Sequence, residues 1–321
     1  MKTTIPNELK AAVPQTQWGR ILTATPVIMT IVATMLAGLA SSEMTRAQYD
    51  RSLAAQQQSK AGDQWSYFQA KRLRGGLQRS TLDILQVSGP VRSLDPKQFK
   101  QSINDFPAPA EKPETAKAKA DLLALVNSGV GQQTLALLLS GELPVPPAPN
   151  ASDKQIEAAL HAIETTQPES DVAVLVTPIK VSAVNEALRA AVARAQAFDA
   201  MLAPLNRMVD QIENLLSQMA APDRAFTIAR LRYTASRYDA EARLNQAIAN
   251  LFELQVRQSN LSAERHHRRS QRFFFGMLAA QAAVIIATFS LAAQKRSLLW
   301  SLAAAAGLAA IAFAIYVYFY I

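Results

Sequence analysis

The sequence contains no cysteine, and this absence removes several kinds of chemistry at once. Disulfide bonds, thiolate zinc sites and cysteine nucleophiles are all excluded. Histidine is almost as scarce, since only His161, His266 and His267 occur. His266 and His267 are adjacent, so they lie on different faces of a helix, and the neighbouring arginines would repel a metal cation. We interpret them as side chains at a membrane surface, with a pH-sensitive role as the alternative, and we expect neither a metal nor a cofactor.

Patterns typical of catalysis are also missing. Gly75-Gly76 and Gly129-Val130-Gly131 lack the Lys and Ser/Thr of a phosphate-binding loop, so they indicate turns or flexibility. The carboxylates are dispersed singly, as expected of solvated helix faces. We therefore predict that the protein is not an enzyme. A cavity with converging polar groups between the helices would reopen that question.

Charge is absent from three long segments. Ile21 to Ser42, Phe273 to Ala293 and Ser297 to Ile321 contain no Asp, Glu, Lys or Arg. Each can cross a hydrocarbon core, which needs about 20 helical residues. The first is too long for the apolar core of a cleaved signal peptide, so it is expected to remain as an anchor, with a kink where Pro26 interrupts it.

The second and third segments are separated only by Gln294, Lys295 and Arg296, which predicts a tight antiparallel hairpin. Small residues at four-residue spacing would let the helices of this hairpin approach closely. They are Ala279, Ala283, Ala287, Ala303 and Gly307.

These features predict an all-α integral membrane protein with three transmembrane helices around a long-helix, coiled-coil-like soluble region. The expected parts are a tail (1–20), a first span (21–42), a mainly helical domain (43–272) with proline-rich linkers near 106–113 and 143–149, a second span (273–293) and a third span (297–321).

The formal charge of +8 is concentrated beside the second span, in Arg265, Arg268, Arg269 and Arg272. Anionic lipid headgroups account for this cluster, whereas no aromatic residues interleave with it as single-strand nucleic-acid binding requires. We therefore predict contact with the lipid bilayer and no nucleic acid. More Lys and Arg flank the spans on the domain side than on the other, which favours a cytoplasmic domain, although the basic N-terminal tail argues the reverse.

The soluble region is expected to consist mostly of helices. One helix should continue from the first span to Leu85, staying straight or bending near Gly62 or Gly75-Gly76. A second helical piece is expected over Glu114 to Ser140. From Asp171 to Lys180, valines alternate as in a short strand, but no partner strand is evident, so we expect an extended segment.

Apolar residues then follow helical spacing from Val181 to Met219, with Pro204 expected to kink or divide the helix. After Pro222, an amphipathic pattern runs without a break into the second span. Helices 181–219 and 223–270 are expected to pair with each other, and they are also our candidate surfaces for a homo-oligomer or a protein partner.

A motif after the first span resembles one family. The residues Gly62-Asp63-Gln64-Trp65-Ser66-Tyr67-Phe68-Gln69-Ala70-Lys71 are similar to a signature of DUF4337, bacterial membrane proteins of unknown function. The layout over about the first 85 and last 90 residues is similar too. The resemblance implies only this layout, and it makes Asp63, Trp65, Tyr67, Gln69 and Lys71 residues of interest. We expect the chain to be a multi-pass protein of the bacterial inner membrane. Physically, Asp63 is predicted to cap a helix that docks Trp65, Phe68 and Lys71 on another helix or on the membrane interface.

Two functions from different classes remain. The first is a membrane-anchored helical scaffold or interaction protein, suggested by the long apolar seam that leads into the hairpin. The second is a membrane sensor, in which a ligand bound to the helical domain moves the helices that enter the membrane.

Overall fold

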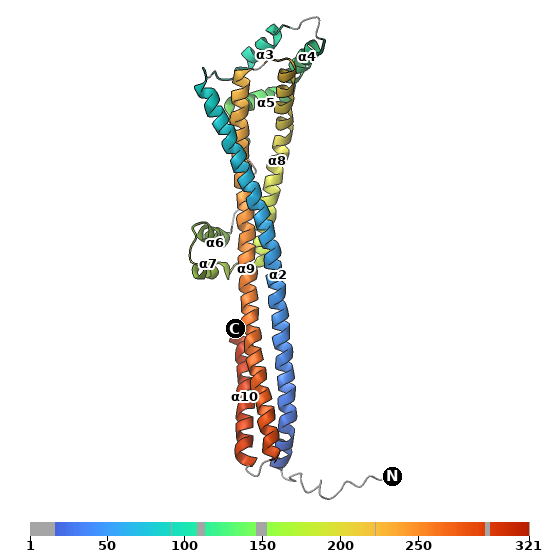
Figure 1. The fold of residues 1–321 in the computed structure, drawn as a ribbon, viewed down its shortest axis with the longest axis vertical. Helices are drawn as coiled ribbons and strands as arrows, with labels where there is room; N and C mark the ends of the chain where they lie inside the picture. Colours follow the sequence, from blue (N-terminus) through green and yellow to red (C-terminus); the bar gives the residue numbers. More distant parts are fainter. Residues whose placement is uncertain are drawn as a thin grey trace, which may run out of the picture. The chain divides into compact units, whose positions relative to one another are not determined.

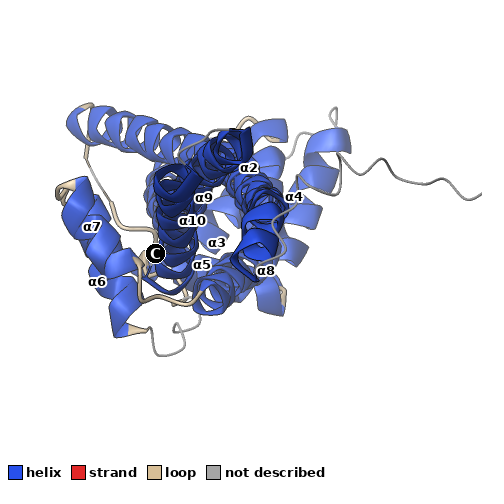
Figure 2. Ribbon diagram, turned by 90° about the horizontal axis from the view of Figure 1, so that it is seen from below, coloured by secondary structure: helices blue, strands red, loops and turns tan. Residues whose placement is uncertain are grey.

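A computed structural model describes residues 17–90, 92–107, 113–145, 153–221, 223–292 and 296–320. Over these residues every regular element is an α-helix, as Figure 2 shows, so the predicted all-α class is confirmed. The chain forms two compact units. Unit 1 comprises residues 1–55 and 257–321, and unit 2 comprises residues 56–256.

The helices in chain order are α2 (Gln17–Val87), α3 (Pro96–Asp105), α4 (Pro113–Asn127), α5 (Gly129–Ser140), α6 (Lys154–Glu164), α7 (Glu169–Val176), α8 (Val181–Gln218), α9 (Arg224–Ala292) and α10 (Arg296–Tyr320). Both unit boundaries fall inside helices, one in α2 and one in α9. The expected helix from the first span to Leu85 is confirmed, because α2 is unbroken at Gly62 and at Gly75-Gly76.

Unit 1 is built from α10 and the adjoining parts of α2 and α9, which run side by side in Figure 1. Small side chains contribute to this packing, since Ala33, Ala280 and Ala310 form one buried cluster. Of the small residues predicted to lie between the helices, four are buried and Ala279 is partly buried. Close approach of apolar helices through small residues is the expected way to associate them where water provides no driving force.

Two helices, α2 and α9, are long and apolar enough to cross a membrane. The described apolar part of α10 is shorter, Ser301–Val317. The pair α4 and α5 also passes the same test if it is taken as one span, but the two helices meet at a bend of 78°. Both contribute side chains to the core of unit 2, so we interpret them as core helices rather than a span.

The core of unit 2 joins α3, α4 and α5 to the later half of α8 and the beginning of α9. Leu122 and Val126 of α4 are fully buried there, as is Ile212 of α8. Phe99 of α3 stacks on Phe226 of α9, with ring centroids 5.5 Å apart. Burial of these side chains removes apolar surface from water and holds the short helices in place.

The predicted seam of α8 is mostly buried within unit 2, in this core from Val209 onward and in a second cluster, with Leu244 of α9, at Phe198 and Leu202. Residues from Phe198 to Met219 at the predicted spacing are buried or partly buried, whereas Val181 at the beginning of the helix is exposed. Pro204 lies inside α8 without dividing it. The second expected helix is confirmed as α9, which continues without a break to Ala292.

Three predictions about local structure were wrong. Asp63 lies in the interior of α2, so it caps no helix. The segment expected to be extended forms α7, because Val172 and Val176 lie one helical turn apart and both are buried. The helical piece over Glu114 to Ser140 divides at Ser128, where the Ser128 hydroxyl accepts a hydrogen bond from the Gly131 amide at 3.0 Å.

The proline-rich linkers are only partly described. Pro113, predicted to end the first linker, is instead the first residue of α4, a favourable position for proline. Leu143 to Val145 are not helical, in agreement with the second linker. The remaining residues of both linkers lie largely outside the described residues, as do the central residues of the predicted hairpin loop.

At Gly75, α2 packs closely against α9 within unit 2. A Cβ atom at Gly75 would lie 3.3 Å from Asp239 Oδ1, whereas a Cβ atom at the neighbouring Gly76 would meet nothing within 4 Å. Gly76→Ala is expected to raise the free energy of unfolding by about 1 kcal/mol through helix propensity alone. For Gly75→Ala the contact should offset this gain. Denaturant unfolding of the full-length chain in detergent, followed by circular dichroism, measures both, and equal stabilisation would contradict the close approach.

Candidate functional site

Unit 2 contains a cluster of charged residues between α2 and α9. Glu241 of α9 is buried, with only 8% of its surface exposed, and its carboxylate forms an ion pair with Lys71 of α2. Its other oxygen lies 3.4 Å from Arg237 Nε, one helical turn earlier. A buried carboxylate is retained only where opposite charges compensate the loss of water. The Glu241 carboxylate therefore links α9 to α2 through Lys71.

Further cationic contacts surround this pair. Lys71 Nζ and Arg237 Cζ lie 5.4 and 4.8 Å from the centre of the Tyr238 ring, within the range of cation–π attraction. Arg79 of α2 forms a second ion pair with Asp239 of α9. Gly75 lies beside Asp239, so the small residue and the charged pairs share the face of α2 that packs on α9.

Burial also shifts ionisation in this part of unit 2. The pKa of Asp199 on α8 is raised by desolvation and by repulsion from Glu241, with Lys71 and Arg237 acting in the opposite direction. Burial raises the pKa of Tyr233 to about 12. The Tyr233 hydroxyl donates a hydrogen bond to Asn206 Oδ1 of α8 at 2.7 Å, which satisfies its polar group.

A small polar cavity of about 170 Å³ lies next to these groups. Its walls are polar side chains from three helices and a single valine. They are Gln78 of α2, Asn206, Val209 and Asp210 of α8, and Arg230, Tyr233, Thr234, Arg237 and Tyr238 of α9. The hydroxyl and amide groups suit recognition of a small polar solute. The guanidinium groups of Arg230 and Arg237 would favour an anion, against the negative charge of Asp210 in the same wall and of their partners Glu213 and Glu241. The walls contain no Cys, Ser or His that could act as a nucleophile or a base.

Tyr233 gives this cavity a measurable pH signature. Below pH 10 the phenol is protonated in the folded and unfolded chain, so its contribution to stability is fully present. Between pH 10 and about 12 only the unfolded chain loses the proton, and the free energy of unfolding falls as the pH rises. In Tyr233→Phe, the free energy of unfolding should therefore fall less between pH 10 and about 12. In an ultraviolet titration of the folded chain, this variant should also lack the tyrosinate absorbance that appears at the highest pH. Tyr67→Phe, which removes an exposed tyrosine hydroxyl outside the cavity, is the control.

The family-like motif divides between two environments. The Trp65 indole donates a hydrogen bond to Glu253 of α9 at 2.6 Å, and Lys71 forms the ion pair with Glu241. Asp63, Tyr67 and Gln69 are exposed. Trp65 also contacts Phe68 edge to face, with centroids 5.4 Å apart. Trp65 and Lys71 therefore fasten α2 to α9 within unit 2, while the other three motif residues face outward.

The four predicted lipid-contact arginines lie on α9 in unit 1. Arg268 pairs with Glu264 at 2.9 Å on the surface, and Arg265 is exposed. Arg269 and Arg272 are partly buried.

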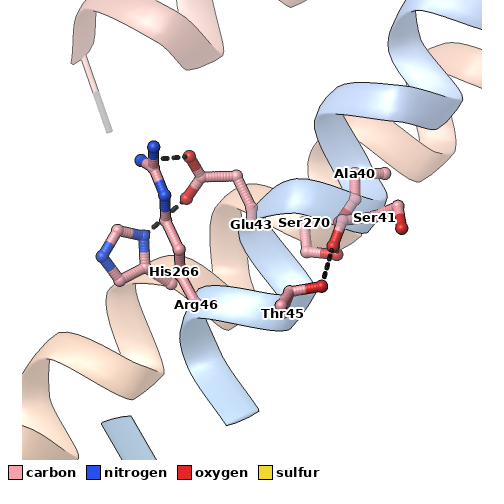
Figure 3. Close-up of polar contacts among 7 residues, drawn as sticks. All are labelled: Ala40, Ser41, Glu43, Thr45, Arg46, His266 and Ser270. Atoms are coloured by element: carbon pink, nitrogen blue, oxygen red, sulfur yellow. Dashed lines mark hydrogen bonds and ion pairs between the residues drawn. The ribbon is translucent and has the colours of Figure 1, made fainter. Parts of the chain in front are cut away.

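Next to these arginines, Glu43 of α2 lies between Arg46 and His266, as Figure 3 shows. The distances are 3.5 Å from Glu43 Oε1 to Arg46 Nη1 and 2.6 Å from Glu43 Oε2 to His266 Nδ1. His266 thus has a specific carboxylate partner on α2, whereas His267 does not share that contact.

The buried carboxylate was missed by the sequence analysis. Glu241 and Asp239 were interpreted as solvated, but both pair with cations on α2. One signal was readable, since Arg237 and Glu241 stand four residues apart. The partners on α2 are 170 residues away in the case of Lys71, and no local pattern reveals them. Over the described residues, no group of three His, Asp or Glu side chains could hold a metal ion.

Together these features define an all-α protein with two to three long apolar helices that could cross a membrane. Residues 19–125 match the family model of DUF4337, a domain of unknown function. The resemblance inferred from the motif at Gly62 to Lys71 is thereby confirmed and extends to α4, while the last 90 residues lie outside the match. Neither a curated protein nor a solved structure matches the chain.

Proposed function

We propose that the protein is a membrane-anchored helical scaffold. Its unit 1 would hold it in the bilayer through three spans, formed by the apolar parts of α2 and α9 and by α10. Unit 2 would present helical surface to a partner on the cytoplasmic side of a bacterial inner membrane. The proposal contains no catalytic role.

The observation that supports this proposal is an apolar stripe on α2 in unit 2. It consists of Leu73, Leu77, Ile84 and Val87, whose exposed fractions lie between 58% and 89%. Ser80 occupies the one polar position of this series, so the stripe steps alternately by four and three residues from 73 to 87. This is the spacing of a coiled-coil seam. Apolar side chains so exposed and so aligned are typical of a surface that a further helix covers.

A second copy of the chain is the partner that this stripe fits best. Copies anchored in one membrane point the same way, so their α2 helices can pair in parallel with Leu77 opposite Leu77. The predicted surface on helices 181–219 and 223–270 offers less apolar area, because Phe198, Leu202, Ile212 and Leu216 of α8 are buried inside unit 2. The stripe on α2 is therefore our candidate contact.

Cysteine cross-linking in native membranes tests the contact, because the chain has no cysteine of its own. Leu77→Cys should form a disulfide-linked dimer on mild oxidation. Arg74→Cys, which is exposed but lies off the stripe, is the matched control and should not. Ile84→Lys places a charge on the stripe, so it should suppress the dimer formed through Leu77→Cys. Equal yields from Leu77→Cys and Arg74→Cys would refute pairing through α2.

The sidedness of unit 2 is tested by labelling Val87→Cys with a membrane-impermeant thiol reagent. Val87 is 89% exposed, so access is limited only by the membrane. Labelling that requires cell lysis would agree with a cytoplasmic unit 2. Labelling of intact cells would place unit 2 outside and overturn the orientation derived from flanking Lys and Arg.

A membrane sensor is the second candidate, and the polar cavity of unit 2 favours it. A small anion held by Arg230 and Arg237 would bridge side chains of α2, α8 and α9. The full-length chain should then show a higher unfolding temperature with phosphate, sulfate or a dicarboxylate than with equal chloride. Arg230→Gln should abolish the shift. No shift with any of these anions would count against the sensor.

A further inference from the structure

Unit 1 contains an open groove between α2 and α9. Its volume of about 610 Å³ falls in the range of small-molecule sites. Apolar side chains form most of the wall. The lining residues are Ala37, Ala40, Ser41 and Met44 of α2 and His267, Ser270, Gln271, Phe274, Phe275 and Met277 of α9.

The groove crosses the boundary between uncharged and charged sequence. Ala37 belongs to the uncharged segment of α2, and Phe274, Phe275 and Met277 belong to that of α9. Met44, His267 and Gln271 lie outside these segments. One end of the groove is therefore at the depth of acyl chains and the other at the depth of headgroups, if the uncharged segments span the bilayer.

The helices that form the groove are held together by a specific contact. The buried Ser270 hydroxyl donates a hydrogen bond to the Ala40 carbonyl oxygen at 2.7 Å, and both residues are labelled in Figure 3. Small side chains at Ala37 and Ala40 leave the space that a larger residue would fill. The groove is thus formed by the packing of α2 against α9.

The headgroup end is lined by His267 and Gln271 and lies next to Arg268 in the sequence of α9. His267 Nε2 lies 3.0 Å from Gln271 Nε2, whereas His267 Nδ1 is shielded from water and has no hydrogen-bond partner among the described residues. Arg268 stands three residues before Gln271, on the same side of α9. The nearby Glu43 carboxylate is already paired with His266 and Arg46. Arg268 pairs with Glu264 at 2.9 Å, but both side chains are exposed, so this surface contact has little weight and the guanidinium can also attract an anion at this end.

We propose that the groove binds an anionic phospholipid, with an acyl chain along Ala37, Phe274 and Phe275 and the phosphate beside His267 and Arg268. The inference rests on the proposed insertion of α2 and α9 in a membrane. It extends the predicted contact of the α9 arginines with lipid from a diffuse attraction to a bound molecule in a defined place.

Photo-cross-linking on the full-length chain tests the site. The protein is reconstituted into phosphatidylcholine vesicles containing a minor fraction of phosphatidylglycerol with a diazirine in its acyl chain. Labelled peptides are then identified by mass spectrometry. Label should concentrate on residues 37–44 and 267–277, and unlabelled phosphatidylglycerol should compete about tenfold better than phosphatidylcholine. Label spread evenly over all apolar segments would overturn the site.

Variants separate the two ends of the groove. Ala37→Phe fills the apolar end and should remove most of the labelling, whereas Leu39→Phe, on the exposed side of α2, should leave it unchanged. His267→Ala combined with Arg268→Gln should abolish the preference for phosphatidylglycerol. Equal competition by both lipids in the unaltered chain would refute the anionic headgroup site. Extraction of the chain from vesicles by alkaline carbonate would instead refute the membrane insertion on which the inference rests.

Discussion

Replacing Phe226 by alanine is expected to lower the free energy of unfolding by about 3–5 kcal/mol, because it removes a large buried ring and leaves a cavity. Phe226 is only 2% exposed and stacks on Phe99, with an angle of 13° between the ring planes. It joins α9 to α3, a helix of 10 residues that is too short to be stable without such packing. Denaturant unfolding of the full-length chain measures the loss, and hydrogen exchange in α3 should accelerate with it.

Two comparisons make the Phe226 result interpretable. Phe226→Leu keeps much of the side-chain volume and should cost clearly less than Phe226→Ala. Val174→Ala on α7 alters a side chain that is 73% exposed, so it should change stability by less than about 0.5 kcal/mol. A Phe226→Ala variant as stable as Val174→Ala would mean that the core around Phe99 and Phe226 does not hold α3 in solution.

The sequence predicted the helices of the two units better than their polar contacts. Periodic apolar residues identify the buried face of α8, since Phe198, Leu202, Val209 and Ile212 follow helical spacing and all lie inside. Such a pattern depends on local geometry alone. It failed at Val181, where the helix begins and no neighbour covers the seam.

The failures arise where tertiary contacts decide between local alternatives. Alternating valines in 172–176 fit a strand, but Val172 and Val176 also fit one face of a helix, and packing selects the helix α7. Asp is a common N-cap residue, but α2 already begins at Gln17, far before Asp63. The backbone amides after Asp63 therefore bond within the helix and need no cap. Only the pairing of α2 with α9 could reveal that Lys71 faces Glu241.

Glu241→Gln is expected to lower the free energy of unfolding by about 3 kcal/mol. The substitution leaves the ammonium of Lys71 and the guanidinium of Arg237 without the carboxylate that they share. The side chains of Glu241 and Lys71 are 10% and 27% exposed, so water only partly replaces the lost partner. Asp199 should compensate in part, since removal of the Glu241 charge relieves the repulsion that raises its pKa.

Glu213→Gln is the matched control, because Glu213 pairs with Arg230 at 2.8 Å but is 45% exposed. Glu213→Gln is expected to lower the free energy of unfolding by less than about 1 kcal/mol. Adding Lys71→Met to Glu241→Gln should recover part of the lost free energy of unfolding, because the uncompensated cation is then removed. The double-mutant cycle should give a coupling energy of about 1–3 kcal/mol between Lys71 and Glu241. If Glu241→Gln were no more costly than Glu213→Gln, the ion pairs between α2 and α9 would be surface contacts of little weight. The attachment of α2 would then rest on Trp65 and on the close approach at Gly75.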